Sequence, residues 1–183
     1  LPDREEAIAL ALTVAEDDFD VVRARAIEFL LREAPLQTLR RFLPDALRSN
    51  DRGVRAAAAA AIGRHGLTIH VEDVFAMTTD RDPVVLTEAA RALGRLRHTR
   101  AVEALLRLVS HDERPVQLAS LEALGDCAPL HTVEALLPFT EGFTRPGEVK
   151  DAAREAIRRI QTRAGGGEGG RLTVVESDDA SGG

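Results

Sequence analysis

The sequence has no tryptophan, no tyrosine and only one cysteine, Cys127. A single cysteine excludes an internal disulfide framework and any thiolate cluster for zinc or for iron and sulfur. The chain also lacks an apolar run of the roughly 18 to 20 residues that a membrane span requires, and residues 1–30 show neither the basic start nor the apolar stretch of a secretory signal. We therefore expect a cytoplasmic protein with no membrane partner, although the start at Leu1 leaves open a signal removed by processing.

Basic residues are outnumbered by acidic ones. The chain carries 24 Lys and Arg against 30 Asp and Glu, a net charge of −6. A non-specific nucleic-acid binder needs a basic stripe that displaces counterions from phosphates, so we expect no nucleic-acid partner. Within residues 1–20, Arg4 stands against seven acids: Asp3, Glu5, Glu6, Glu16, Asp17, Asp18 and Asp20.

The sequence does contain a repeat. Five times a valine is followed eight positions later by leucine or isoleucine, and the pair recurs every 31 to 33 residues. The pairs are Val22/Leu30, Val54/Ile62, Val85/Leu93, Val116/Leu124 and Val149/Ile157. A fixed period of this size is typical of stacked repeat proteins, in which each unit buries its apolar face only against its neighbours.

Each valine belongs to a predicted helix, here called a first helix, that has small residues on one face. Small side chains in register let neighbouring helices approach closely, while the aliphatic residue at +8 supplies the buried area. The small rows are Ala26, Ala58, Ala89, Ser120 and Ala153 at +4, and Phe29, Ala61, Ala92, Ala123 and Ala156 at +7. Gly63, Gly94 and Gly125 follow at +9 and are interpreted as close-packing or helix-end residues.

A second helix with its own aligned apolar rows follows each first helix. Asp51 and Asp82 stand before first helices, where an acceptor side chain suits a helix start. The sequence predicts ten helices, at about residues 3–16, 19–33, 36–48, 52–65, 70–79, 83–96, 99–110, 115–127, 131–141 and 147–163. The array starts with a second helix and ends with a first helix, so these half-units are either caps or the ends of a piece of a longer solenoid.

The segments 51–63 (DRGVRAAAAAAIG) and 82–94 (DPVVLTEAARALG) resemble HEAT repeats. The length near 31 and the Ala-Leu-Gly ending are similar to the short HEAT-like subtype that is also seen in phycobilisome lyases. The resemblance covers residues 1–163 and implies an all-α fold, a right-handed α–α superhelix (a HEAT-like α-solenoid of armadillo type) with about four to five helix pairs. It also implies that the second helices line a concave groove that usually holds a partner.

With that geometry, the outward positions of the second helices are the candidate partner-binding residues. They are Arg40, Glu72, Glu103 and Glu134 in one row, with Arg41, Asp73 and Arg107 beside it. Two interpretations stay open: outward charges usually serve only solvation, whereas their ordered succession across repeats favours a protein or peptide partner. The neighbouring apolar row, Met77, Leu108 and Phe139, is interpreted as packing between repeats rather than as a binding hot spot.

Catalytic signals are scarce in this sequence. The five histidines include no pair at the i, i+4 spacing that places two metal ligands on one helix face. Asp112 of the lone His111-Asp112 pair is interpreted as a helix cap, and Cys127 lies in a buried register. HEAT-like iron hydroxylases use repeated His-Glu pairs, which are absent, and HEAT-like DNA glycosylases need a basic groove and commonly use aromatic residues. We expect no catalytic residues, no metal and no cofactor.

Residues 164–183 differ in composition and indicate a Gly-rich, acidic, flexible tail after the solenoid of residues 1–163. The apolar stretch within residues 171–176 can add as a strand to a partner or dock on the solenoid itself. Three functions stay open for the chain: a non-catalytic scaffold or adaptor that binds a protein or peptide, an enzyme-accessory subunit similar to a chromophore (bilin) lyase, and a regulatory fragment of a larger multidomain protein. We expect the first.

Overall fold

The computed structural model describes residues 3–15, 20–142 and 146–165, and every regular element within these ranges is helical. The first helices are α2 (Asp20–Glu33), α4 (Arg52–His65), α6 (Pro83–Arg95), α8 (Arg114–Cys127) and α10 (Gly147–Gly165). The second helices are α1 (Arg4–Val14), α3 (Leu36–Leu47), α5 (Val71–Ala76), α7 (Val102–Leu108) and α9 (Val133–Leu136). The predicted all-α fold is confirmed.

The second helices of the later repeats are shorter than predicted because 3₁₀ turns flank them. These turns are η1 (Thr68–His70), η2 (Met77–Thr79), η3 (Thr99–Ala101), η4 (Leu130–Thr132) and η5 (Leu137–Phe139). After α5, the hydroxyls of Thr78 and Thr79 donate to the carbonyl oxygens of Phe75 and Ala76 at 2.8 and 2.9 Å. These oxygens therefore accept a side-chain hydrogen bond where a continuing helix would supply a backbone N–H. Pro138 in η5 has no N–H to donate, which favours the end of α9.

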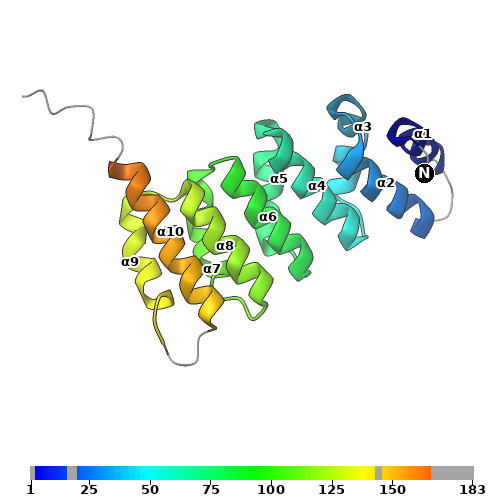
Figure 1. The fold of residues 1–183 in the computed structure, drawn as a ribbon. Helices are drawn as coiled ribbons and strands as arrows, with labels where there is room; N and C mark the ends of the chain where they lie inside the picture. The colour runs from blue at the N-terminus through cyan, green and yellow to red at the C-terminus, as the bar shows by residue number, and fades with distance from the viewer. Residues whose placement is uncertain (1–2, 16–19, 143–145, 166–183) are drawn as a thin grey trace, which may run out of the picture.

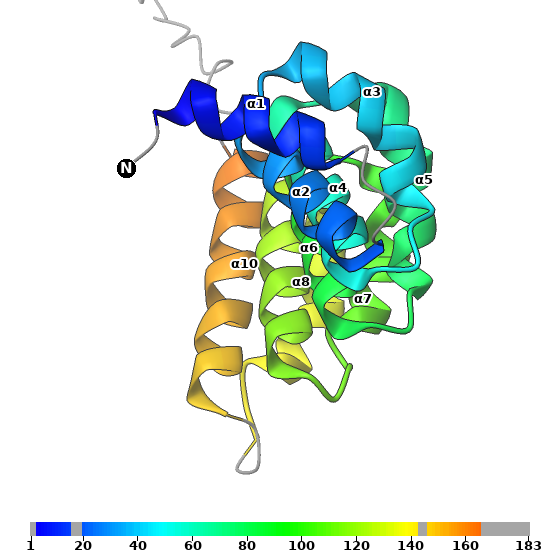
Figure 2. The same cartoon turned by 90° about the vertical axis from the view of Figure 1, so that its right-hand side faces the viewer.

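The helices lie in two layers (Figures 1 and 2). The first helices α2, α4, α6, α8 and α10 stack side by side in one layer, and α3, α5, α7 and α9 form the other. Each second helix packs against the first helix that follows it in the sequence, as α3 does against α4 and α7 against α8. In space the described chain therefore consists of five pairs, from α1–α2 to α9–α10, which is the arrangement of a HEAT-like α-solenoid.

The small rows and the glycines form the contacts between adjacent first helices. A Cβ atom on Gly63 would lie 2.6 Å from the Cα atom of Ala92, and a Cβ on Gly94 would lie 2.7 Å from the Cα of Ala123. Carbon atoms cannot approach so closely, and therefore only glycine allows these backbones to touch. The same arrangement recurs less tightly between α8 and α10. The predicted close-packing role of the glycines is confirmed.

The first repeat departs from this pattern. The repeated valines of the four later repeats are at most 1% exposed, whereas Val22 is 47% exposed. At the seam between α2 and α4, Leu31 stands in the row that holds Gly63, Gly94 and Gly125 in the next three repeats. A leucine side chain at this row holds helix axes farther apart than glycine does, so α2 cannot approach α4 as closely as α4 approaches α6.

Side-chain caps begin two of the first helices as predicted. The carboxylates of Asp51 and Asp82 accept hydrogen bonds from the backbone N–H groups of Val54 and Val84 at 3.1 and 2.9 Å. The interpretation of Asp112 as a cap of α8 is wrong. The N-cap residue of α8 is Glu113, without a side-chain cap, and the backbone N–H of Glu113 donates instead to Nδ1 of His111 at 3.0 Å.

The C-terminal helix extends past the predicted domain boundary. The boundary at residue 163 lies inside α10, which continues to Gly165. Its exposed side carries the pairs Asp151–Arg154 and Glu155–Arg158, so it presents a polar face. Residues 166–183 lie outside the described part of the chain, and the flexible tail stays a prediction.

Candidate protein-binding surface

The second helices present all seven predicted residues to solvent. Arg40 and Arg41 lie in α3, Glu72 and Asp73 in α5, Glu103 and Arg107 in α7, and Glu134 in α9. We call the surface that these seven residues share the second-helix face. Their exposure meets a requirement for binding, while the concave shape and the binding role of this face stay predictions.

Two of the acids on this face are already paired. The Oε1 atom of Glu72 lies 2.9 Å from Nη1 of Arg100 in η3, so this ion pair joins neighbouring second helices. The Oδ2 atom of Asp73 lies 3.0 Å from Nδ1 of His70 on the same turn. Exposed pairs of this kind contribute little stability, but the guanidinium group of Arg100 offsets the negative charge that Glu72 brings to the face.

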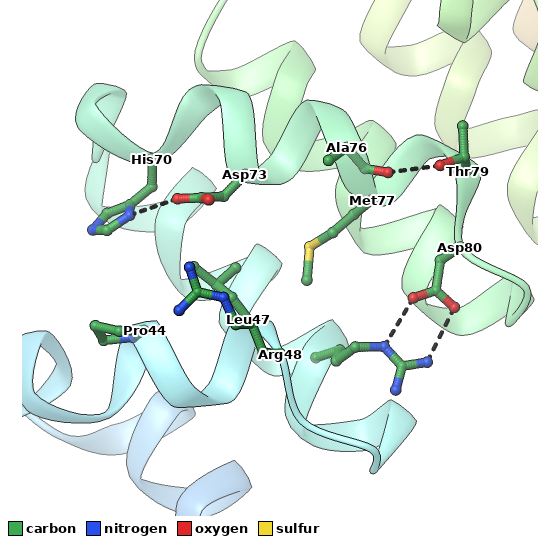
Figure 3. Close-up of a pocket in the computed structure, with 10 residues that line it drawn as sticks. Pro44, Leu47, Arg48, His70, Asp73, Ala76, Met77, Thr79 and Asp80 are labelled. Atoms are coloured by element: carbon green, nitrogen blue, oxygen red, sulfur yellow. Dashed lines mark hydrogen bonds and ion pairs between the residues drawn. The ribbon is translucent and has the colours of Figure 1, made fainter.

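A groove of about 460 Å³ lies between the end of α3 and α5. Leu47 and Arg48 line it from the α3 side, and Asp73 and Met77 from the α5 side. In Figure 3, Met77 of η2 points toward Leu47 and Arg48. The guanidinium group of Arg48 makes no hydrogen bond or ion pair with any residue that the structure describes. We call this space the α3–α5 groove.

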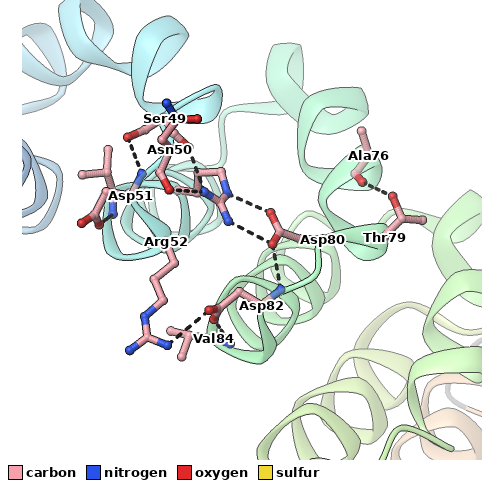
Figure 4. A network of polar contacts seen from close by, with 11 residues as sticks. Ser49, Asn50, Asp51, Arg52, Ala76, Thr79, Asp80, Asp82 and Val84 are labelled. Carbon is pink, nitrogen blue, oxygen red and sulfur yellow. Dashed lines mark hydrogen bonds and ion pairs between the residues drawn. The ribbon is translucent and has the colours of Figure 1, made fainter.

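One wall of the α3–α5 groove is fixed by a paired arginine and aspartate (Figure 4). Arg55 donates from Nε and Nη2 to the two carboxylate oxygens of Asp80 at 2.8 and 3.1 Å. Its Nη1 donates to the carbonyl oxygens of Ser49 and Asn50 at 2.8 and 3.1 Å. Both side chains are largely buried, and the bidentate geometry is the strong form of this contact. The network joins the turn before α4 to the turn before α6.

The pKa values of this pair move in the directions that favour the charged forms. The hydrogen bond to Asp80 raises the pKa of Arg55 and outweighs the opposing effect of burial. Burial acts to raise the pKa of Asp80, but hydrogen bonds from Arg55 and from the backbone N–H of Asp82 outweigh it, so the pKa of Asp80 is lowered. The wall therefore keeps both charges at neutral pH.

A second groove of about 800 Å³ lies between α2, α3 and the start of α4. Its apolar lining includes Ala24, Ile27, Phe42, Ala46 and Val54, and its charged lining includes Arg23, Arg41, Asp45, Arg48 and Asp51. The guanidinium carbon of Arg41 lies 5.4 Å from the centroid of the Phe42 ring, within the range of a cation–π contact. We call this space the α2–α3 groove.

The structure brings only part of the predicted set into these grooves. Arg41 lines the α2–α3 groove and Asp73 lines the α3–α5 groove, while the other five predicted residues line neither. Sequence reasoning missed Arg48, which lines both grooves. Arg48 is the C-cap residue of α3 and lies outside the aligned helical rows. The only feature of the sequence that could have indicated its role is a basic residue directly after the last turn of the helix.

The apolar row beside the predicted site packs inward. Met77 and Leu108 are buried, and Phe139 packs against the hydrophobic core. The interpretation of this row as packing between repeats is confirmed, and it provides no exposed hot spot.

Cys127 is buried in α8, and burial raises the pKa of its thiol to about 11. Because the thiolate is the reactive form, this side chain suits packing rather than nucleophilic chemistry. Across the described ranges no group of three or more His, Cys, Asp or Glu side chains is placed to hold a metal ion. Among the described helices, none combines the length and the apolar character needed to cross a bilayer.

Comparison with known proteins identifies the repeats. Residues 71–158 match the family model for HEAT repeats. No curated protein matches the chain. Among solved structures, the complex of CpcE and CpcF of phycocyanin lyase from Nostoc sp. PCC7120 is 23% identical with a TM-score of 0.68, over 92% of this chain and 68% of that chain.

Two engineered proteins show a similar architecture. Each is 20% identical to this chain, with TM-scores of 0.61 and 0.60, and the alignments cover 92% and 86% of this chain and 87% and 81% of theirs. Likeness at these identities establishes the fold alone, and it extends over the helices on both sides of the matched repeats. Together with the glycine seams and the paired helix layers, these matches show that residues 71–158 are HEAT repeats and that the described chain has the fold of a HEAT-like α-solenoid.

Proposed function

We propose that this protein is a non-catalytic adaptor that binds a protein or peptide segment on its second-helix face. The observation that carries the proposal is the pair of grooves on either side of α3, with Arg48 lining both. Each groove combines apolar side chains with charged groups at its edge, which is the combination that a peptide segment needs for affinity and orientation.

The α2–α3 groove supplies the anchoring part of such a site. Ile27, Phe42 and Ala46 offer an apolar surface on which a partner side chain can be buried. Arg41 and Arg48 stand at the same groove and can attract a carboxylate of the partner. A segment that carries an apolar residue beside an acidic one fits this arrangement, and the charges farther along the second-helix face orient the rest of it.

The comparisons support a binding role without assigning a partner. The similar solved structure from Nostoc is a complex of two proteins, CpcE and CpcF. Its likeness to this chain is at the level of fold, so it supports a protein partner in general terms. The prediction of a regulatory fragment of a larger protein stays a prediction.

The test is affinity capture from a lysate of the source cells with the full chain as bait. We expect the Arg40→Glu/Arg41→Glu variant to lose the captured protein, because reversal of two adjacent charges at the basic end of the face repels a complementary partner. The matched control is Arg95→Glu/Arg97→Glu, which makes the same change of charge at exposed residues at the end of α6. Capture that survives the first variant, or that both variants lose equally, contradicts the proposal.

An accessory role similar to that of a bilin lyase is the second candidate, and the fold likeness to the phycocyanin lyase complex favours it. The same purified bait distinguishes the two. A pigment retained on the chain, detected by visible absorbance in the absence of a protein partner, would place the lyase-like role first. A colourless bait with a charge-dependent protein partner supports the adaptor.

A further inference from the structure

The last second helix leaves apolar side chains uncovered. One row of the second helices differs in exposure along the solenoid: Leu43 is 0% exposed, Leu12, Phe75 and Leu106 are partly buried, and Leu137 is 53% exposed. All residues of this row are large and apolar, and Leu137 is the exposed one. Leu130 in η4, which precedes α9, is 54% exposed.

Four of the exposed residues in the segment η4–α9–η5 are apolar, and His131 and Glu134 are exposed among them. We call Leu130, Ala135, Leu137 and Pro138, all of them exposed, the terminal apolar face. The neighbouring helix α10 presents the polar pairs Asp151–Arg154 and Glu155–Arg158 to solvent. The end of the second-helix layer thus exposes four apolar residues beside His131 and Glu134, whereas the exposed side of α10 is polar.

An earlier repeat shows which segment covers this row. The ring of His98 packs against Phe75 edge to face, with centroids 6.3 Å apart and an interplanar angle of 71°. His98 follows α6, the first helix that packs against α5. In the α5–α6 pair, the chain that leaves the first helix therefore covers the row residue of the second helix. For Leu137 in the α9–α10 pair, the corresponding segment is the one that leaves α10.

The sequence after α10 has the composition and the length to do this. It continues from Gly165 through a glycine-rich stretch to Leu172, Thr173, Val174 and Val175. Six residues lie between Gly165 and Leu172, so the Cα atoms of these two residues can be at most about 25 Å apart when the chain is extended. The segment from η4 to η5 is only about 18 Å long by its helical rise, and η4 packs against α10, which lies beside α9 in Figure 1.

We propose that residues 172–175 dock on the terminal apolar face of the same chain. This contact goes beyond the adaptor role and does not depend on it. Burial of leucine and valine side chains against Leu130 and Leu137 drives the contact. A short glycine-rich tether keeps the effective concentration of the segment high at small entropic cost.

A spin label near the segment tests the contact in the full chain. Cys127 is buried, so the cysteine of a Ser177→Cys variant is the thiol that reacts. We expect the label to broaden backbone amide signals of η4, α9 and η5 selectively. We expect Leu172→Asp/Val174→Asp in that labelled chain to remove the selective broadening, and Leu137→Asp to do the same from the other side.

The matched control is Ile69→Asp, which places the same charge at an exposed apolar residue in η1, distant from α9 in the sequence. It should leave the broadening unchanged. Broadening that is absent, spread evenly over the surface, or unaffected by the aspartates overturns the proposal. A mixture of labelled chain and separately ¹⁵N-labelled chain identifies contacts between copies, and broadening in that mixture overturns docking within one chain.

Discussion

Arg64 of α4 holds the backbone at the end of α2 through the carbonyl oxygen of Arg32. Its Nη1 atom donates to that oxygen at 2.5 Å, and its Nη2 donates to the carbonyl oxygen of Leu31 at 3.0 Å. The last carbonyl groups of a helix have no partner within the helix, so a side chain from the next repeat supplies one. The seam between α2 and α4 lacks the glycine contact of the later seams. These two hydrogen bonds join the two helices at the C-terminal end of α2.

We expect Arg64→Met to lower the free energy of unfolding by about 0.5 to 1.5 kcal/mol, because it removes both hydrogen bonds and keeps most of the aliphatic stem. Arg95→Met is the control, since Arg95 occupies the same repeat position in α6 and makes no hydrogen bond with a described residue. Urea denaturation of the two variants measures the difference. Equal losses would show that the hydrogen bonds to α2 contribute nothing.

A second prediction concerns the seam between α4 and α6. Gly63→Ala should cost on the order of 1 to 3 kcal/mol, because the added Cβ would lie 2.6 Å from the backbone of Ala92 and the helices must separate. Gly147→Ala makes the same chemical change where a Cβ meets nothing within 4 Å, and it should be neutral or stabilise by up to about 1 kcal/mol. Thermal melting of both variants is the measurement, and a Gly63→Ala protein as stable as Gly147→Ala would disprove the close contact.

The Arg55–Asp80 pair predicts a dependence of stability on pH. Because the pKa of Asp80 is lowered in the folded state, its contribution is present above the unfolded pKa of about 4 and is lost as pH falls through the folded pKa. Asp80→Asn should therefore destabilise the protein by about 1 to 3 kcal/mol at pH 7 and by progressively less below pH 4. Urea denaturation at pH 7 and pH 3 tests this.

The control for this series is Asp151→Asn, which breaks an exposed pair on α10. Its effect should be small at both pH values, since exposed ion pairs contribute roughly 0 to 1 kcal/mol. A constant difference between the Asp80→Asn variant and the wild type from pH 7 to pH 3 would rule out the lowered pKa.

The buried thiol of Cys127 should react slowly with a disulfide reagent in the native protein. Burial raises its pKa to about 11, so little thiolate is present at pH 8 and the reagent has poor access. In the urea-unfolded chain the reaction should approach the rate of free cysteine. A native rate as fast as the unfolded one would show that α8 opens readily or that the thiol is activated.

Several predictions from the sequence were confirmed because they depend on repetition. The positions of the ten helices, the small rows and the glycines of the seams recur at a fixed spacing. A recurring position must satisfy the same packing requirement in each repeat, so the pattern predicts which side of a helix is buried. The 3₁₀ turns around α5 were missed because single residues, such as Thr78, override the average pattern locally. Nothing in the repeat pattern distinguished the exposed Val22 from the buried valines of the later repeats.

Periodicity in the amino-acid sequence is enough to establish a stack of HEAT-like helix pairs with charged, outward-facing second helices. The ion pair between Arg100 and Glu72, the position of Arg48 at two grooves and the exposure of Leu137 became known from the assembled fold. The physical reason is that periodicity reports the direction of a side chain from its own helix. Contacts between residues of different repeats depend on the separation of helix axes and on side-chain reach, which are set only when the whole stack is assembled.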